Sequence, residues 1–169
     1  MKVGFIGLGN VGYKLANSIL ESGYDLLIND LDKKAGKILI EKGAKWIETP
    51  KELAQESDIS ITCLPSPAVV ASVLEGKNGL IEGMVPGKLW IEMSTTDSKE
   101  MQRLADLVIG KKALAIEAPV SGGCHRAATG NIAILVGGTR EAFDLAMPAL
   151  SVIGYQILHI GPIGSASVL

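Results

Sequence analysis

The feature that most constrains this chain is a glycine-rich turn near its N-terminus, Gly7-Leu8-Gly9-Asn10-Val11-Gly12. The turn follows a short apolar run at residues 2–6 and precedes apolar residues at helical spacing. A G-x-G-x-x-G between a strand and a helix is typical of turns that bind the pyrophosphate of a dinucleotide. Gly7 permits the tight turn, Gly9 lets phosphates approach the backbone, and Gly12 lets helix and strand pack closely. The alternative is that the three glycines serve only the turn itself.

The rest of the chain alternates short apolar runs with segments of helical character. Further strands are predicted at residues 26–28, 45–47, 59–64, 89–93, 113–116, 132–136 and 156–160. Helices are predicted from Pro50 onward, over residues 97–109 and over residues 140–150, and Pro148 is expected to end or bend the last of these. This alternation predicts an α/β domain with a mostly parallel sheet.

Composition narrows the class of protein. Hydrophobic residues make up 47% of the 169 residues, yet no apolar run reaches the length of about 18 residues that a membrane span needs. Sixteen basic against eighteen acidic residues give a net charge of −2, so we expect no binding to nucleic acid. Cys63 and Cys124 match no metal or redox spacing and are expected to be free thiols. We therefore expect a cytoplasmic protein without a metal site or membrane contact.

Asp30 ends the second predicted strand, about 20 residues beyond the glycine turn, where an acid meets the ribose hydroxyls of a dinucleotide. An acid there favours NAD, because its charge repels the 2′-phosphate of NADP. Leu31 stands where an arginine would hold that phosphate, whereas Lys33 and Lys34 leave NADP open. The alternative is that Asp30 caps the next helix.

Three further loops follow predicted strands, at the edge where ligands bind in open α/β sheets. Residues 64–67 form either a ligand contact or a loop stiffened by two prolines. In residues 93–96 the hydroxyls are placed to meet a ribose or nicotinamide, although Thr96 or Asp97 would serve equally as a helix cap. In residues 117–123, Ser121 and the N–H groups of the following two glycines form either a simple turn or a cradle for a substrate carboxylate.

The adjacent Cys124, His125 and Arg126 are assigned no role. The chain has two histidines, the second at position 159 in a predicted strand, and they build neither a metal site nor a Ser-His-Asp arrangement.

Taken in order, five segments resemble the β-hydroxyacid dehydrogenase family, which includes 3-hydroxyisobutyrate dehydrogenase and tartronate semialdehyde reductase. These segments are residues 4–12, 64–65, 93–95, 118–123 and 161–165. The resemblance covers the whole chain. It departs from the family pattern at Glu117, usually Asp, and at Arg126 and Ala166, both usually Gly.

The resemblance implies that residues 1–169 form a doubly wound Rossmann domain that binds NAD, with NADP as the alternative. The implied cofactor-binding residues are Gly7, Leu8, Gly9, Asn10, Val11, Gly12, Asp30, Leu64, Pro65, Val69 and Thr95. It further implies that Ser121, Gly122 and Gly123 hold the carboxylate of a small 3-hydroxy acid, which the whole enzyme oxidises by hydride transfer.

In the family, a lysine acts as general acid and base, and its position aligns just after Leu169. The all-helical second domain that follows it is also absent from these residues. We therefore expect residues 1–169 alone to bind nucleotide without turnover, and the full-length protein to form a homo-oligomer.

Two alternatives remain open. A non-catalytic, dehydrogenase-like nucleotide-binding module would lack the lysine altogether. An imine reductase-like enzyme would share the N-terminal motifs and lack the lysine. Such enzymes usually carry Asn-Arg in place of Asp30-Leu31, prefer NADP and lose the Ser-Gly-Gly loop, which this chain keeps.

Overall fold

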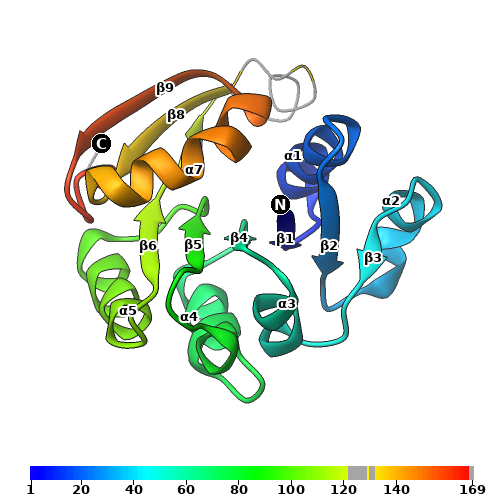
Figure 1. Cartoon of the computed structure of the whole chain (residues 1–169), viewed down its shortest axis with the longest axis horizontal. Helices are drawn as coiled ribbons and strands as arrows, with labels where there is room; N and C mark the ends of the chain where they lie inside the picture. Colours follow the sequence, from blue (N-terminus) through cyan, green and yellow to red (C-terminus); the bar gives the residue numbers. More distant parts are fainter. Residues whose placement is uncertain (122–128, 130–131, 168–169) are drawn as a thin grey trace.

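The structure is a computed structural model that describes residues 1–121, 129 and 132–167, and a twisted sheet runs through its centre (Figure 1). Strands β1 to β6 are all parallel and lie in the order β3-β2-β1-β4-β5-β6. Their bounds are Lys2–Ile6, Asp25–Asn29, Lys45–Trp46, Ile59–Thr62, Leu89–Glu92 and Leu114–Glu117. This order is that of a doubly wound dinucleotide-binding sheet, so the predicted α/β fold class is confirmed.

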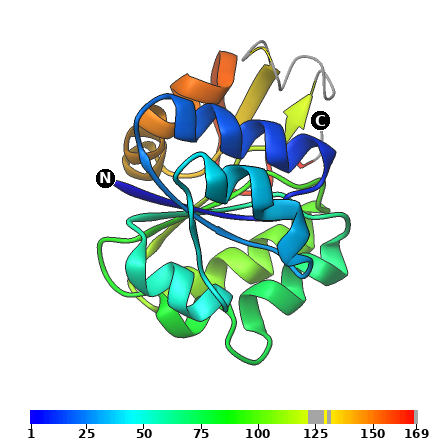
Figure 2. The same ribbon diagram turned by 90° about the vertical axis from the view of Figure 1, so that its right-hand side faces the viewer.

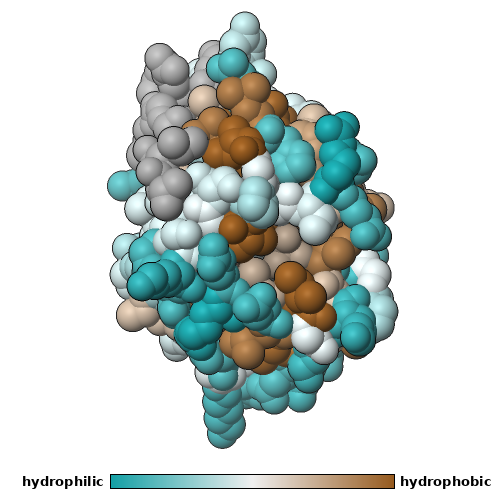
Figure 3. Space-filling view, turned by 90° about the vertical axis from the view of Figure 1, so that its left-hand side faces the viewer, coloured by the Kyte–Doolittle hydropathy of each residue, from teal (hydrophilic) through white to brown (hydrophobic). Residues whose placement is uncertain are grey.

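The sheet continues past β6 with strands of mixed direction. Strand β8 (Ile132–Gly137) is antiparallel to β6 and to β7 (Val120–Ser121), and β9 (Gly154–Gly161) is parallel to β8. Apolar residues are scattered among polar ones on the side of the molecule where β9 lies (Figure 3), and Leu158 of β9 is 45% exposed. The sheet is thus mostly parallel, as predicted, with an antiparallel extension.

Helices cover both faces of this sheet (Figure 2). One face carries α1 (Asn10–Glu21), α2 (Lys37–Glu41) and α7 (Arg140–Ile153), and the other carries α3 (Pro50–Glu56), α4 (Pro67–Glu75) and α5 (Ser98–Gly110). Short 3-10 turns lie at η1 (Lys33–Gly36) and η2 (Leu80–Gly83). Strand β4 is buried along its whole length, because a parallel strand covered on both faces has no solvent side.

Two predictions about prolines differ from the structure. Residues 64–67 are not only a loop, because Ser66 caps α4 and Pro67 occupies the first turn, where the missing N–H costs nothing. Of the two outcomes expected at Pro148, an end of the helix is wrong, because α7 continues to Ile153. Ala149, Leu150 and Ile153 are buried beyond it, so packing against the sheet outweighs the lost backbone hydrogen bond.

Within the described residues, no helix combines the length and apolarity that a membrane crossing requires.

Glu117, the last residue of β6, attaches the segment after β9 to the sheet. Its side chain is buried, with 1% exposed. Its Oε1 accepts hydrogen bonds from the N–H groups of Gly164 (2.7 Å) and Ala166 (2.8 Å), and the Ser167 hydroxyl donates to Oε2. A carboxylate at this position therefore fixes the course of residues 164–167.

Replacing Glu117 by alanine is expected to lower the free energy of unfolding by about 2–3 kcal/mol, because buried donors lose their acceptor. Urea denaturation measures this. Glu117→Gln keeps a neutral acceptor and should lose less than half as much. An alanine variant as stable as the native chain would contradict the role given to this carboxylate.

Candidate functional site

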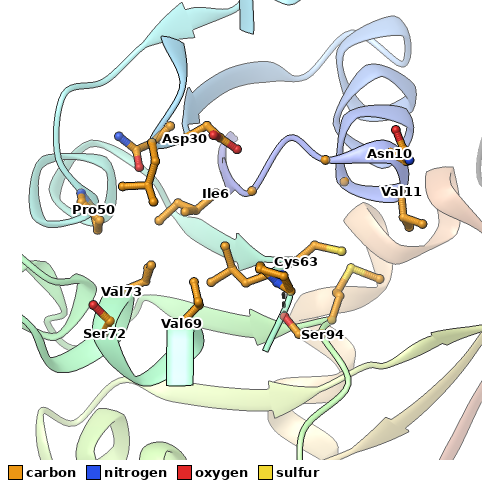
Figure 4. Close-up of a pocket in the computed structure, with 18 of the residues that line it drawn as sticks. Ile6, Asn10, Val11, Asp30, Pro50, Cys63, Val69, Ser72, Val73 and Ser94 are labelled. Carbon is orange, nitrogen blue, oxygen red and sulfur yellow. Dashed lines mark hydrogen bonds between the residues drawn. The ribbon is translucent and has the colours of Figure 1, made fainter. Parts of the chain in front are cut away.

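A cavity of about 1110 Å³ lies along the carboxyl ends of β1, β2, β4 and β5 (Figure 4). It straddles the boundary between β1 and β4, where the strand order reverses and where open α/β sheets bind ligands. Its volume exceeds the roughly 300–1,000 Å³ of pockets that take drug-sized ligands. The cavity is thus large enough for an extended ligand.

The glycine turn forms one wall, and each of its glycines meets a different requirement. A Cβ on Gly7, whose φ is +102°, would lie 2.1 Å from the carbonyl oxygen of Cys63, and one on Gly12 would lie 2.0 Å from the carbonyl oxygen of Gly7. Gly9 lines the cavity, and a Cβ on it would meet no protein atom within 4 Å. Close packing therefore requires glycine at positions 7 and 12, whereas Gly9 leaves open space for a ligand beside the backbone.

Helix α1 begins directly at this open space. Its cap residue is Gly9, which has no side chain with which to accept hydrogen bonds from the first turn. The free N–H groups and the positive end of the helix dipole at Asn10 and Val11 are suited to an anion. Both residues line the cavity. This wall therefore fits the pyrophosphate of a dinucleotide.

Asp30 follows β2 and lines the cavity, with one carboxylate oxygen bonded to the glycine turn. Its Oδ2 accepts a hydrogen bond from the N–H of Leu8 (2.7 Å), and Oδ1 accepts one from the N–H of Asp32 (2.9 Å). Asp32, not Asp30, caps the next helical turn by accepting from Lys34 (3.0 Å). The interpretation of Asp30 as a helix cap is therefore wrong. Leu8, which the resemblance assigns to the cofactor, is buried and does not line the cavity, and its backbone N–H holds Asp30.

The second half of the cavity is built by β4, β5 and α4. Leu64, Pro65, Val69 and Thr95, the residues that the resemblance assigns to the cofactor, line it. The hydroxyl of Ser94 accepts a hydrogen bond from the N–H of Leu64 (2.7 Å), which joins the ends of β4 and β5 (Figure 4). Of the two caps considered, Asp97 is the one that caps α5.

Sequence reasoning missed several lining residues, and two of them lie on α4, a helix that it did not place. Ser72 and Val73 face the cavity beside Val69, which the resemblance does name (Figure 4). The Ser66-Pro67 pair, a cap followed by a first-turn proline, is the signal that could have found this helix. Trp46 and Glu48, near the end of β3, also line the cavity.

Two titratable groups beside the cavity are shifted by burial. Burial raises the pKa of the Glu92 carboxyl to about 7, while hydrogen bonds from Ser94 oppose the rise. Burial also raises the pKa of the Cys63 thiol to about 12, with a further contribution from the nearby Glu92 charge. Cys63 therefore stays protonated near neutral pH and is a poor nucleophile.

The predicted carboxylate loop is only partly within the described residues. Val120 of β7 lines the cavity, and the backbone of Ser121 pairs with Ala133 of β8. Gly122 and Gly123, like Cys124, His125 and Arg126, lie outside the described residues, so carboxylate binding stays a prediction. Across the part of the chain that the structure describes, no group of three or more His, Cys, Asp or Glu side chains is arranged to hold a metal ion.

Comparison with known proteins places this cavity in context. Residues 2–161 match the family model described as the NAD binding domain of 6-phosphogluconate dehydrogenase. An uncharacterised oxidoreductase of Bacillus subtilis is 39% identical over 163 residues, which cover 96% of this chain and 57% of the relative. A probable mitochondrial 3-hydroxyisobutyrate dehydrogenase of Dictyostelium discoideum is 36% identical over 166 residues, 98% of this chain and 52% of the relative.

A solved structure is similar along the whole described fold. The Mycobacterium tuberculosis 3-hydroxyisobutyrate dehydrogenase, solved with L-serine, superimposes with a TM-score of 0.92 at 27% identity. The match covers 99% of this chain and 56% of that chain. This chain thus spans just over half the length of the curated relatives described above.

The hydrogen bond from Leu8 to Asp30 is expected to stabilise the glycine turn before any ligand binds, and the one from Asp32 stabilises the loop after β2. Asp30→Ala should lower the free energy of unfolding by about 2 kcal/mol, because a charged acceptor for two backbone donors is lost. Urea denaturation without nucleotide measures this. Asp32→Ala, which removes only an exposed cap, is the control and should lose less than half as much. An equal decrease in the free energy of unfolding in the two variants would show that Asp30 does not stabilise the turn more than an exposed cap would.

Proposed function

This chain belongs to the family of NAD-binding domains found in 6-phosphogluconate dehydrogenase and in the β-hydroxyacid dehydrogenases, and we propose that it serves an enzyme that transfers a hydride between NAD and a small 3-hydroxy acid. The cofactor class, a nicotinamide dinucleotide, follows from the family. The observation that supports the proposal most directly is the open space at Gly9, next to the uncapped start of α1 and within one cavity with Asp30.

The cavity suggests how such a nucleotide would lie. Its pyrophosphate would meet the N–H groups at the start of α1, and the adenosine ribose would meet Asp30 at the end of β2. The nicotinamide half would then extend over the ends of β4 and β5, because each half of a doubly wound sheet takes one mononucleotide. There it would contact Leu64, Pro65, Val69 and Thr95.

Two features favour NAD over NADP. Asp30 carries a negative charge where the 2′-phosphate of NADP would lie, and the neighbouring Leu31 is fully exposed and uncharged. Lys33 is the cation that lines this end of the cavity, but its Nζ lies 3.8 Å from Glu48 Oε1 and 5.7 Å from the centre of the Trp46 ring. An ion pair this exposed contributes only about 0–1 kcal/mol, so the preference for NAD rests on Asp30 and Leu31.

A nicotinamide dinucleotide held here would supply the acceptor for the hydride on the carbon that bears the substrate hydroxyl. The part of this chain is to hold the nucleotide along the sheet edge. Ser121, Gly122 and Gly123 are proposed to hold the substrate carboxylate, as in the resemblance. Residues 113–169 contain no lysine, so none of them takes the role of general acid and base that the resemblance assigns to a lysine. Location in the cytoplasm and homo-oligomer formation stay predictions.

Gly9→Ala is expected to weaken NADH binding by about tenfold or more, because the added methyl group enters the space proposed for the pyrophosphate. A fluorescence titration of NADH measures the Kd. Gly110→Ala is the matched control, since its Cβ also meets no atom within 4 Å but lies at the end of α5. Unchanged affinity in the Gly9 variant would exclude a phosphate at this turn.

The protein that carries this domain is expected to oxidise 3-hydroxyisobutyrate with NAD⁺ and to bind NADH about tenfold more tightly than NADPH. Absorbance of NADH and competition between the two nucleotides measure these properties. Tighter binding of NADPH would favour the imine reductase-like alternative. Tight binding of NADH without oxidation of any 3-hydroxy acid would favour the non-catalytic module.

A further inference from the structure

Three buried polar side chains lie side by side just below the cavity wall. Thr62, Glu92 and Glu117 end strands β4, β5 and β6, and their Cα atoms are register partners. Register partners on parallel strands point to the same face of a sheet. Each of the three is 1% exposed. Glu92 therefore lies in the middle of a buried polar row, between a hydroxyl and a second carboxylate.

Glu92 is connected to the cavity by two short hydrogen bonds. Its Oε1 accepts the N–H of Ser94 (2.7 Å), and the hydroxyl of Ser94 accepts the N–H of Leu64 (2.7 Å). Ser94 and Leu64 both line the cavity, whereas Glu92 does not. One carboxylate thus holds the end of β5, and through Ser94 it holds the loop that follows β4.

Hydrogen bonds from Ser94, Thr62 and the backbone of Met93 favour the ionised form of Glu92, but within the described residues no cation compensates its charge. In the described part of the chain, its Oε2 has no hydrogen-bond partner, and no lysine or arginine forms an ion pair with it. Thr62 Oγ1 accepts from the indole of Trp90 (3.0 Å), and Glu117 is bonded to residues 164–167. The nearby Cys63 thiol is neutral. A buried charge without a counter-ion is costly, so a purely structural role would be served as well by a neutral side chain.

We propose that Glu92 is a positioning residue for the nucleotide cavity, whose carboxylate holds Ser94, and through it Leu64, in the geometry that binds the nicotinamide half of the nucleotide. The inference rests on the proposed function, because it takes a dinucleotide as the ligand of this cavity. A charged acceptor forms a hydrogen bond roughly twice as strong as a neutral one. The ionised form of Glu92 therefore fixes the wall more firmly than the protonated form.

This arrangement gives nucleotide binding a pH dependence with a definite sign. Because the pKa of Glu92 is raised to about 7, the ionised fraction grows as the pH rises through neutrality. A nucleotide that binds more tightly when Glu92 is ionised must lower the pKa of Glu92 on binding. The affinity for nucleotide therefore falls as the pH falls. A decrease of about one pKa unit on binding makes the Kd about fivefold larger at about pH 6 than at about pH 8.

The test is a fluorescence titration of NADH at both pH values, with the native protein and with Glu92→Gln. We expect the native Kd to rise about fivefold towards acid, while the Gln variant should bind with one Kd at both pH values, weaker than native at about pH 8. Glu117→Gln is the matched control. It neutralises the neighbouring, equally buried carboxylate, which is bonded to residues 164–167 and not to the cavity wall, and it should keep the native pH dependence.

A Glu92→Gln variant that keeps the native pH dependence, or a native Kd equal at both pH values, would overturn the inference. If Glu92→Gln does not fold, Ser94→Ala takes its place, because it cuts the link to Leu64 while leaving the carboxylate. The Ala variant should then lose most of the pH dependence, and its full retention would overturn the inference equally. Absence of NADH binding by the native protein at both pH values is a distinct result, which would overturn the proposed function itself.

Discussion

The close contact of the glycine turn with the strands on either side is the constraint on which the rest of the site depends. The carbonyl oxygen of Gly7 lies where a side chain on Gly12 would begin, and the carbonyl oxygen of Cys63 lies where one on Gly7 would begin. The first contact brings the start of α1 against the end of β1, and the second brings the turn against the residue that follows β4. This position of α1 leaves a cavity between the two halves of the sheet and places the start of the helix, which is suited to an anion, at one wall of that cavity.

Much of the fold could be predicted because each central strand is buried on both faces. Such strands appear in the sequence as short, continuous apolar runs, as at residues 59–62 and 89–92, and helical spacing between them gives the layers. The errors came where local chemistry and packing compete. Pro67 favours a loop by composition but a first turn of helix once Ser66 supplies the cap, and Pro148 is tolerated because α7 is held by the buried residues that follow it.

The site divides in the same way. Gly9 and Asp30 could be assigned to the cavity edge because a local motif and a strand end determine where they lie. The link from Glu92 through Ser94 to Leu64 could not, because it depends on the relative height of two strand ends that are about 30 residues apart in the chain. Glu92 looks in the sequence like an ordinary polar residue at the end of a strand. Only its burial, which is a property of three adjacent strands and the helices beneath them, gives it an unusual pKa.

The hydrogen bond between Asp30 and Leu8 also bears on how a nucleotide would enter. The acid that is suited to a ribose is already joined to the backbone of the turn that is suited to the phosphates. The two recognition elements are therefore held in register with each other while the cavity holds only solvent, and folding, not binding, has restricted their motion. A ligand that meets a surface arranged in advance loses less entropy on association. The carboxylate of Asp30 thus stabilises the turn in the free protein before it contacts a nucleotide.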